Sequence, residues 1–337
     1  MEFQRNVSLL PFNTFGIDRS AKFFTTVQSE SDVVAALKKA QSEDVPVIVL
    51  GGGSNILLTR DLDALILKIE IEGIEKIKED ENHVWIEVGA GVNWHHFVIV
   101  CIEKNWAGVE NLSLIPGTVG ASPMQNIGAY GIEIKEVFDH LTAVNRDTLD
   151  IEKFNWTQCE FGYRESVFKN KLKDKYIITK VCFKLNKNPV YHTEYGAIKD
   201  TLQEMGIEEL NIKAISDAVI QIRQSKLPDP KEIGNAGSFF KNPSISKSEF
   251  ERLQKEFPNI PGYPLPEGVK VPAAWLIEQS GWKGKRLGQI GVHQKQPLVL
   301  VNYGGGDGAE IVDLSKQIQV SVLEKFGIHL SPEVNFL

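Results

Sequence analysis

The glycine-rich stretch at positions 115–131 constrains the fold of this chain more than any other part of its sequence. It reads IPGTVGASPMQNIGAYG, with glycines interleaved with small polar residues and few charges. Long loops of this kind are uncommon unless they are functional. Glycine lets the backbone approach a ligand closely, so such a segment can wrap a large neutral ring and offer amide groups to a pyrophosphate. The stretch therefore predicts a binding loop rather than a structural turn.

A second glycine stretch, LGGGSN at 50–55, directly follows a short apolar run. Its successive backbone amides, with the side chains of Ser54 and Asn55, are suited to holding phosphate oxygens. It is not a dinucleotide fingerprint, because Ile56 stands where a third glycine is expected, and it lacks the Lys-Ser/Thr of a P-loop. On these residues alone, a plain strand-ending turn is an equally good interpretation.

Length, charge and cysteine content limit the class of protein. The 337 residues are enough for two or three domains, and the net charge of −7 argues against a general nucleic-acid binder. No apolar run is long enough to cross a bilayer, and the first ten residues do not resemble a signal peptide. Cys101, Cys159 and Cys182 are odd in number and widely spaced, which suits reduced thiols in the cytoplasm.

Hydrophobic spacing predicts the order of the structural elements. In the first part we expect a helix that begins after Ser29, a strand over 45–50 buried on both faces, and a strand over 64–69. Residues 73–187 are expected to form an α+β region with a mostly antiparallel sheet, which includes a helix capped by Asn93. Its expected strands are 83–91, 137–144 and 176–185.

A segment rich in Pro and Gly, 224–237, is the best candidate for a linker. The helix before it is predicted over 213–224, and those after it near 247–256, 273–280 and 308–326, with a strand over 297–302. These features divide the chain into 1–70, 71–226 and 227–337.

Three shorter stretches contain polar residues in unusual surroundings. GNAGSFFKNP, 234–243, places Ser238 on a tight turn, although turn serines are common and an ordinary turn is the simpler interpretation. FGYRES, 161–166, places Arg164 among aromatic residues, where it could simply stack or pair with Glu165. Tyr195 and Glu333 are weak signals alone. The seven histidines show no metal-binding spacing, so no metal site is expected.

Together these stretches closely resemble one family, the flavin enzymes called UDP-N-acetylenolpyruvoylglucosamine reductases (MurB). The resemblance covers nearly the whole chain, and the ordered set of motifs is specific although each one is short. The TEYGAI segment and the chain length resemble the longer type of the family, which carries a tyrosine-bearing loop over the substrate. The matching stretches are NTFGI (13–17), LGGGSN (50–55), IPGTVGASPMQNIGAYG (115–131), FGYRES (161–166), SKLPDP (225–230), GNAGSFFKNP (234–243), AAWLIEQSG (273–281), VHQKQPLVLVN (292–302) and SPEV (331–334).

The resemblance implies an FAD enzyme of bacterial peptidoglycan synthesis, which reduces UDP-N-acetylglucosamine enolpyruvate to UDP-N-acetylmuramate with NADPH. It implies an α+β fold with an FAD-binding part of the vanillyl-alcohol-oxidase (PCMH) type in two lobes, 1–70 and 71–226. A C-terminal α+β domain, 227–337, would bind the substrate. We expect a monomer without nucleic-acid partners or membrane insertion.

The same resemblance assigns roles to individual residues. A hydride from the flavin leaves negative charge on the neighbouring carbon and its carboxylate, which Arg164 and Glu333 are expected to flank. Ser238 is expected to donate the final proton. The UDP-sugar is expected to contact Tyr195, Lys226, Asn242 and Gln296, with Lys226 at the diphosphate. FAD is expected to contact Gly51, Gly53, Ser54, Asn55, Pro116, Gly117, Gly120, Ser122, Asn126 and Gly128.

Two other functions are compatible with parts of the sequence. A related FAD-dependent oxidase of an alcohol or sugar would share the FAD-binding regions but should lack the GNAGSFFKNP and SPEV stretches. A non-catalytic nucleotide-sugar-binding protein would need no flavin. The sequence gives no account of the glycine-rich segment YGGGDGAE at 303–310.

Overall fold

The computed structural model describes residues 2–337, which fold into two compact units. The first unit holds the residues up to Val7, then Ala21–Gly52 and Asp63–Ser225. The second holds Ser8–Ser20, Gly53–Leu62 and Lys226–Leu337, so two early segments fold with the C-terminal residues. The three-region division at 70 and 226 stays a prediction.

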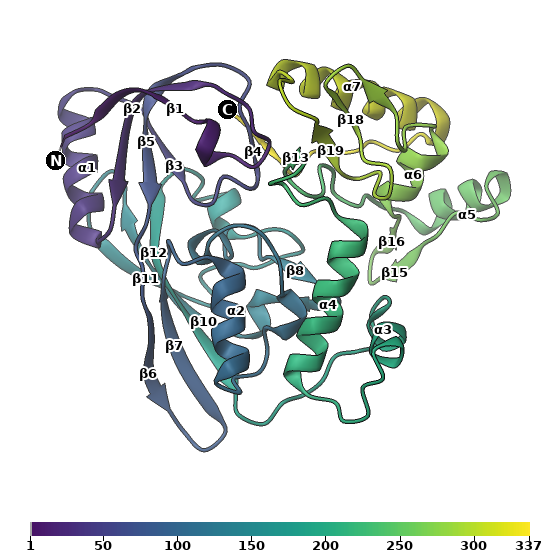
Figure 1. Ribbon diagram of the computed structural model, residues 1–337, viewed down its shortest axis with the longest axis horizontal. Helices are drawn as coiled ribbons and strands as arrows, with labels where there is room; N and C mark the ends of the chain where they lie inside the picture. Colours follow the sequence, from purple (N-terminus) through teal and green to yellow (C-terminus); the bar gives the residue numbers. More distant parts are fainter. Residues whose placement is uncertain (1) are drawn as a thin grey trace. The chain divides into compact units, whose positions relative to one another are not determined.

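A four-stranded sheet with the strand order β1-β2-β5-β3 opens the first unit (Figure 1). Helix α1 (Glu30–Ser42) begins where predicted, because the Ser29 side chain accepts a hydrogen bond from the Asp32 backbone amide. Its buried residues, Val33 and Leu37 among them, join a hydrophobic core with the sheet. The strands are β1 (Gln4–Ser8), β2 (Ser20–Val27), β3 (Val47–Leu50) and β5 (Leu62–Ile69).

Strand β3 corrects one prediction, because it is not buried on both faces. It lies at the edge of the sheet, where it pairs in parallel with β5, and Val49 is 39% exposed. A continuous apolar run is compatible with a central strand, but it does not fix the position of the strand in the sheet.

A five-stranded antiparallel sheet forms the centre of the first unit, as the alternating pattern predicted. Helix α2 (Trp94–Glu103) packs on one face of it (Figure 1), where Trp94, Phe97 and Val98 are fully buried against residues such as Ile86. Asn93 caps this helix by accepting a hydrogen bond from the His96 amide. The strand order is β11-β10-β12-β7-β6, with β6 (Ile74–Glu79), β7 (His83–Gly89), β10 (Phe138–Asn145), β11 (Ile151–Asn155) and β12 (Tyr176–Asn186).

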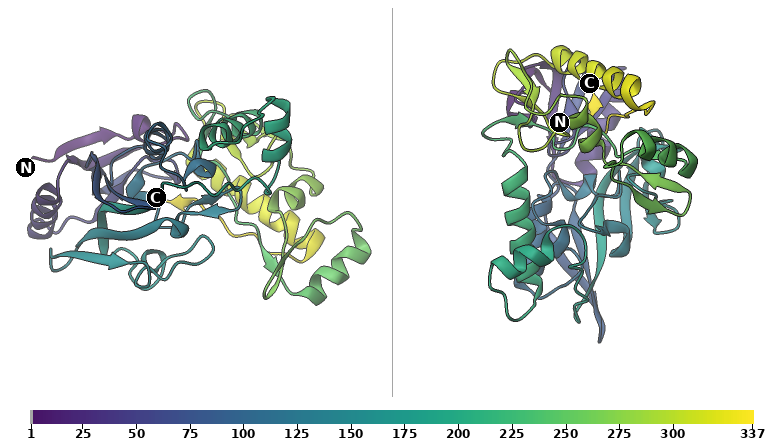
Figure 2. Two further views of the ribbon diagram at one scale, coloured as in Figure 1. Left: turned by 90° about the horizontal axis from the view of Figure 1, so that it is seen from below. Right: turned by 90° about the vertical axis from the view of Figure 1, so that its right-hand side faces the viewer.

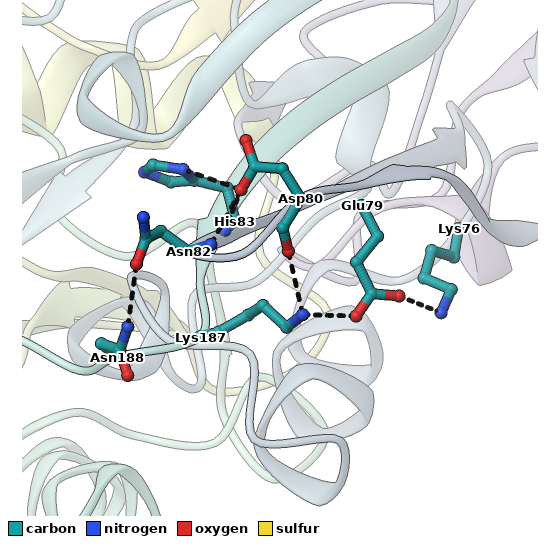
Figure 3. Close-up of polar contacts among 7 residues, drawn as sticks. All are labelled: Lys76, Glu79, Asp80, Asn82, His83, Lys187 and Asn188. Atoms are coloured by element: carbon teal, nitrogen blue, oxygen red, sulfur yellow. Dashed lines mark hydrogen bonds and ion pairs between the residues drawn. The ribbon is translucent and has the colours of Figure 1, made fainter.

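The hairpin of β6 and β7 extends past the end of α2 (Figures 1 and 2), and a polar network holds its tip (Figure 3). The Glu79 carboxylate accepts hydrogen bonds from Lys187 and Lys76, which lower its pKa to about 2. The Asp80 carboxylate accepts hydrogen bonds from the backbone amides of Asn82 and His83, and these bonds lower the Asp80 pKa. These contacts explain the tight turn between the two strands.

Two helices complete the first unit, α3 (Ile198–Glu204) and α4 (Ile212–Lys226). They share a small hydrophobic core to which α4 contributes Ile215, Val219 and Ile222, as their spacing predicted. The described residues 187–197, between β12 and α3, form no helix or strand. Two short strands, β8 (Gly128–Ala129) and β9 (Ile132–Glu133), pair within the glycine-rich region.

The second unit combines short sheets with three helices (Figure 2). Helix α7 packs against α6 and β18, and the predicted helices are confirmed. The predicted strand over 297–302 is shorter than expected, because the Val299 amide donates to the Gln296 carbonyl in a turn. The helices are α5 (Lys247–Glu256), α6 (Ala273–Gln279) and α7 (Gly308–Phe326).

The strands of this unit form two small sheets and one parallel pair. The sheet orders are β13-β19-β18-β17 and β14-β16-β15, while β4 pairs with β20. The strands are β4 (Ile56–Leu57), β13 (Gly234–Asn235), β14 (Ser244–Ile245), β15 (Tyr263–Leu265), β16 (Gly268–Lys270), β17 (Arg286–Leu287), β18 (Ile290–Val292), β19 (Leu300–Asn302) and β20 (Asn335–Phe336).

The structure explains the glycine-rich segment 303–310. The Asn302 Oδ1 atom accepts hydrogen bonds of 3.0 Å from the amides of both Gly304 and Gly306. At Gly308, an added Cβ atom would lie 1.9 Å from the Leu58 carbonyl oxygen. Asp307 then caps α7 in a capping box with Glu310. The segment therefore makes a tight turn and a close backbone contact at the start of α7.

The three cysteines are free and buried. Burial raises the pKa of Cys159 and of Cys182 to about 12, so these thiols stay protonated near neutral pH. Among residues 2–337, no helix has the length and apolar character required to span a membrane.

Candidate functional site

The two predicted glycine-rich stretches meet in the first unit. A Cβ atom added to Gly52 would lie 2.8 Å from the Gly117 Cα atom, and one added to Gly51 would lie 2.8 Å from the Thr118 hydroxyl oxygen. A Cβ atom on Gly120 would lie 2.6 Å from the Ala90 Cβ atom. Only glycine allows backbones to pack this closely, so contact between the stretches explains their composition.

This arrangement fits the predicted binding of FAD. Gly52 and Pro116 are exposed and Gly117 is half-buried, so the paired stretches present backbone to a ligand where side chains would otherwise stand. Backbone amides grouped in this way are suited to the oxygens of a pyrophosphate. The fit depends on these residues being glycines, because the side chains of other residues would fill the space beside the backbone.

Two predicted FAD residues have side chains that bond within the protein. The buried Ser122 hydroxyl donates to the Val119 carbonyl at 2.7 Å. The buried Asn126 side chain donates to the Gly162 carbonyl at 2.9 Å and accepts from the Lys135 amide at 3.1 Å. These side chains stabilise the loop itself, and their contact with a cofactor stays a prediction.

Arg164 lies against the end of the glycine-rich stretch, although thirty-six residues separate it from Gly128 in sequence. Its Nη2 atom donates to the Gly128 carbonyl, and Nη1 lies 3.6 Å from Glu133 Oε1. The Arg164 φ angle is 55°, in the left-handed region that non-glycine residues rarely adopt. Such strain is typical of functional positions, where the surrounding structure holds a side chain in one direction.

Sequence reasoning missed Glu133 as the partner of Arg164. Its Oε1 atom is buried without a hydrogen-bond partner in the described chain, while Oε2 lies 2.7 Å from Lys135 Nζ. The only available signal was its place two residues beyond the glycine-rich stretch, which is weak for a glutamate.

A second missed group fixes the beginning of the same stretch. Leu114 has a φ angle of 58°; its amide donates to His95 Nδ1 at 3.0 Å, and its carbonyl accepts from Arg223 Nε at 3.2 Å. Burial lowers the pKa of both His95 and Arg223, and the nearby Arg223 charge lowers that of His95 further. The positively charged Arg223 therefore lies beside the residue that precedes Ile115.

Tyr195 lies in the segment 187–197 and is 48% exposed. The backbone of Gly131 is close to it, since a Cβ atom added to Gly131 would lie 3.3 Å from the Tyr195 Cβ atom. The structure therefore brings Tyr195 to the far end of the glycine-rich stretch.

In the second unit, the chain is fixed on both sides of Ser238. Gly237 has a φ angle of 69°, and its amide donates to the Asn235 side chain at 2.9 Å. On the other side, Phe239 and Phe240 are each only 1% exposed. Ser238 itself is exposed, and its hydroxyl has no hydrogen-bond partner in the part of the chain that the structure describes.

Backbone hydrogen bonds bring Glu333 next to this turn. The Glu333 amide donates to the Phe239 carbonyl at 2.8 Å, and Phe240 forms a β-bridge with Pro332. The Asn55 side chain donates to the Glu333 carbonyl at 3.3 Å. The second unit therefore unites Ser238, Glu333 and Asn55, which are far apart in sequence.

The LGGGSN stretch passes from the first unit to the second between Gly52 and Gly53. A Cβ atom on Gly53 would lie 1.9 Å from the Phe12 carbonyl oxygen, and the Thr14 amide donates to the Gly53 carbonyl at 3.1 Å. Gly53 therefore has a structural reason to be glycine, while its contact with FAD, like that of Ser54, stays a prediction.

The remaining predicted substrate residues differ in their surroundings. Lys226 is exposed at the last position of α4. The Asn242 Oδ1 atom accepts from the Ala273 amide at 2.9 Å, which satisfies the start of α6. Gln296 lies in the turn before Leu298, whose carbonyl accepts from the Phe239 amide at 2.7 Å. Gln296 is thus connected to the Ser238 turn through one backbone hydrogen bond.

Asp139, His140 and Cys182 have possible metal-ligand atoms within 4.8 Å of one another. The two Asp139 carboxylate oxygens already contact Trp85 Nε1 at 2.9 Å and His140 Nδ1 at 2.7 Å. Burial raises the Cys182 pKa to about 12, and a protonated thiol is a poor ligand. We therefore assign no metal to this group.

Comparison with known proteins gives matches along the whole chain. A family model for an FAD-binding domain matches residues 21–148, and one for the C-terminal domain of UDP-N-acetylenolpyruvoylglucosamine reductase (MurB) matches 229–337. The predicted fold, with an FAD-binding part before a family-specific C-terminal domain, is confirmed.

Full-length relatives carry the same name as the second model. UDP-N-acetylenolpyruvoylglucosamine reductases from Amoebophilus asiaticus and Flavobacterium johnsoniae are 53% and 52% identical, and each match covers 100% of both chains. The crystal structure of MurB from Thermus caldophilus matches with a TM-score of 0.70 at 21% identity. That match covers 100% of this chain and 99% of the other, and it shows that the folds are alike.

Proposed function

Because the chain belongs to the UDP-N-acetylenolpyruvoylglucosamine reductase family, we propose that Arg164, Ser238 and Glu333 act at the reacting carbons of its substrate. The chain is an FAD-dependent reductase of UDP-N-acetylglucosamine enolpyruvate and uses NADPH as its co-substrate. The observation that best supports the proposed roles is the backbone pairing at Phe239, which brings Glu333 next to the turn that carries the exposed Ser238.

The Gly51–Gly52 and Gly117–Gly120 backbones would hold FAD, which when bound supplies the hydride for the vinyl carbon of the substrate. Negative charge then develops on the neighbouring carbon and on its carboxylate. The Arg164 guanidinium would stabilise this charge, since its strained backbone and its bond to Gly128 hold it in one position before the substrate arrives.

Glu333 has a narrower role in this proposal. A carboxylate beside an enolate-like group would repel it, so Glu333 assists only when it is protonated or hydrogen-bonded to a cation. Its backbone bond to Phe239 keeps it at a constant distance from the Ser238 turn, which supports a function shared with that serine.

Ser238 would donate the final proton to the substrate carbon. A hydroxyl is a weak acid, but an enolate carbon is basic enough to accept its proton where the geometry is fixed. The two buried phenylalanines after Ser238 and the bonded Gly237 before it supply that fixed geometry.

Tyr195, Lys226, Asn242 and Gln296 would bind the UDP-sugar, with Lys226 as the partner of the diphosphate. The exposure of Lys226 at the end of α4 supports this role. The Asn242 oxygen is already bonded to Ala273, so Asn242 would contact the substrate through its amide nitrogen.

The proposal extends to the cellular setting. We place the reaction in the cytoplasm and in peptidoglycan precursor synthesis; the three free, buried cysteines support a reducing compartment. We propose that the enzyme is a monomer, which light scattering on the purified holoenzyme checks directly.

The test of the overall reaction uses the purified protein without oxygen. NADPH should bleach the flavin absorbance, and UDP-N-acetylglucosamine enolpyruvate should restore it while UDP-N-acetylmuramate accumulates. Protein that binds the nucleotide but no flavin would instead match the binding-protein alternative. An alcohol or sugar cannot restore the flavin absorbance, because the substrate of an oxidase reduces the flavin rather than reoxidising it.

Arg164 and Lys226 should affect different steps. We expect Arg164→Ala to slow reoxidation by the substrate about 10²- to 10³-fold, because it acts on charge that develops in the transition state. Lys226→Ala should weaken nucleotide binding about tenfold or more, with a smaller effect on the saturated rate. Stopped-flow absorbance and calorimetry measure the two quantities, and Lys231→Ala, which changes another exposed lysine, is the matched control for Lys226. Equal effects of both substitutions on every step would contradict this division.

A further inference from the structure

Two Tyr-Gly pairs pack on each other in the first unit. A Cβ atom added to Gly131 would lie 3.3 Å from the Tyr195 Cβ atom, and one added to Gly196 would lie 3.7 Å from a ring carbon of Tyr130. Both glycines have positive φ angles, 85° and 68°. Each tyrosine thus lies beside the glycine of the other pair, and we call these four residues the Tyr-Gly clasp.

Asn111 bonds to Tyr130 of this clasp and to the segment that carries Tyr195. It is 1% exposed, and its Nδ2 atom donates to the Tyr130 carbonyl at 3.3 Å and to the His192 carbonyl at 2.8 Å. A carboxamide nitrogen has two N–H groups, so one side chain can satisfy both carbonyls. Asn111 thereby connects the glycine-rich stretch with the segment that carries Tyr195.

The short helix that holds Asn111, Glu110–Leu112, is firmly anchored. The Leu112 carbonyl accepts from Trp94 Nε1 at 2.9 Å, and the buried Ser113 hydroxyl lies 2.8 Å from that of Ser216 on α4. Asn111 therefore projects from a base that is bonded to both α2 and α4.

The segment that Asn111 holds is anchored at its start, where Lys187 donates to Glu79 and Asn188 donates to Asn82. Residues 187–197 form no helix or strand in the described chain, and Val190 and Tyr195 are 65% and 48% exposed. A segment without helix or strand samples several conformations unless specific contacts select one. The bond to the His192 carbonyl lies only three residues before Tyr195.

We propose that Asn111 is a positioning residue for substrate binding, because it fixes the Tyr195 segment against the glycine-rich stretch. The inference rests on the proposed function, which assigns Tyr195 to the UDP-sugar. Asn111 touches neither substrate nor cofactor in this account. It reduces the conformational entropy that the segment must lose when the nucleotide binds.

The main test compares Asn111→Ala and Asn111→Asp with the wild-type holoenzyme. Aspartate has nearly the same size but no N–H donor, so it removes both bonds and turns carboxylate oxygens toward the two carbonyls. Calorimetry should show affinity for UDP-N-acetylglucosamine enolpyruvate reduced about tenfold or more. FAD content and the rate of reduction by NADPH should change less than about twofold, because neither step involves the Tyr195 segment.

Hydrogen exchange provides a readout that needs no activity. Without nucleotide, amides 188–197 should exchange faster in both variants, while those of α4 stay as in the wild type. Unchanged exchange at 188–197 would overturn the inference. Asn145→Ala is the matched control, because this asparagine accepts from the amides of Asp147 and Thr148 in the same unit and belongs to no proposed site. It should lower thermal stability and leave nucleotide affinity unchanged.

A double-mutant cycle shows whether Asn111 acts through Tyr195. In a Tyr195→Ala background, Asn111→Ala should weaken nucleotide binding by less than about twofold, since the segment no longer contributes its tyrosine. Additive effects would overturn the inference. If the wild type itself fails to bind the nucleotide, the proposed function fails; if the wild type and Asn111→Ala bind it equally, only this inference fails.

Discussion

Replacing Ser238 with alanine is expected to slow reoxidation by the enolpyruvyl substrate by about 10⁴-fold or more, at or beyond the upper end for a general acid. FAD binding and reduction by NADPH should remain close to wild type, because neither step needs this hydroxyl. The loss should be specific, since the turn is held by the Gly237 amide and the buried Phe239 and Phe240 rather than by the serine side chain. Stopped-flow absorbance of the two half-reactions measures the effect.

Two further variants show that the effect comes from proton donation. Ser238→Cys should recover part of the rate, because a thiol is more acidic than a hydroxyl although larger. Ser246→Ala is the matched control: Ser246 caps α5 by accepting from the Glu249 amide, so its loss should cost about 1 kcal/mol of stability and leave both half-reactions alike. Normal substrate-driven reoxidation in Ser238→Ala would show that Ser238 is an ordinary turn serine and not the proton donor.

Local patterns predicted the α-helices of the described chain except α3, because the causes of the others lie within a few residues. Ser29 and Asn93 cap α1 and α2 through side-chain bonds to amides three residues later. Helix α7 begins at a capping box and ends at Gly327, whose φ of 72° suits glycine. In contrast, the apolar run in β3 did not reveal that the strand is at the edge, since position in a sheet depends on strands elsewhere in the chain.

The sequence predicted the motifs of the candidate site but not the contacts that its residues make. The glycine content of 50–55 and 115–131 indicated close backbone approach, and the structure shows that part of this approach is between the stretches themselves. Asn111, Glu133 and Arg223 were missed, because each acts through residues distant in sequence and belongs to a type that is common on protein surfaces. Long-range pairing of this kind leaves no local pattern.

The contact between the two glycine-rich stretches gives the prediction with the clearest structural basis. Gly52→Ala should reduce FAD affinity about 100-fold or more, because its Cβ atom would lie 2.8 Å from the Gly117 Cα atom. The clash is with backbone, so no flexible side chain can move aside, and the two stretches must separate. Flavin absorbance after desalting, and titration of the apo-protein with FAD, measure the loss.

The matched control for Gly52→Ala is Gly206→Ala, which tests strain without a clash. Gly206 follows α3 in the same unit with a φ angle of 68°, and an added Cβ atom would meet nothing within 4 Å. Alanine there should cost roughly 1 kcal/mol of stability through its left-handed backbone and leave FAD affinity unchanged. Added FAD should then raise the melting temperature of Gly206→Ala as it does for the wild type, but that of Gly52→Ala much less. Equal flavin retention by Gly52→Ala and the wild type would mean that the contact between the glycine stretches does not shape the cofactor site.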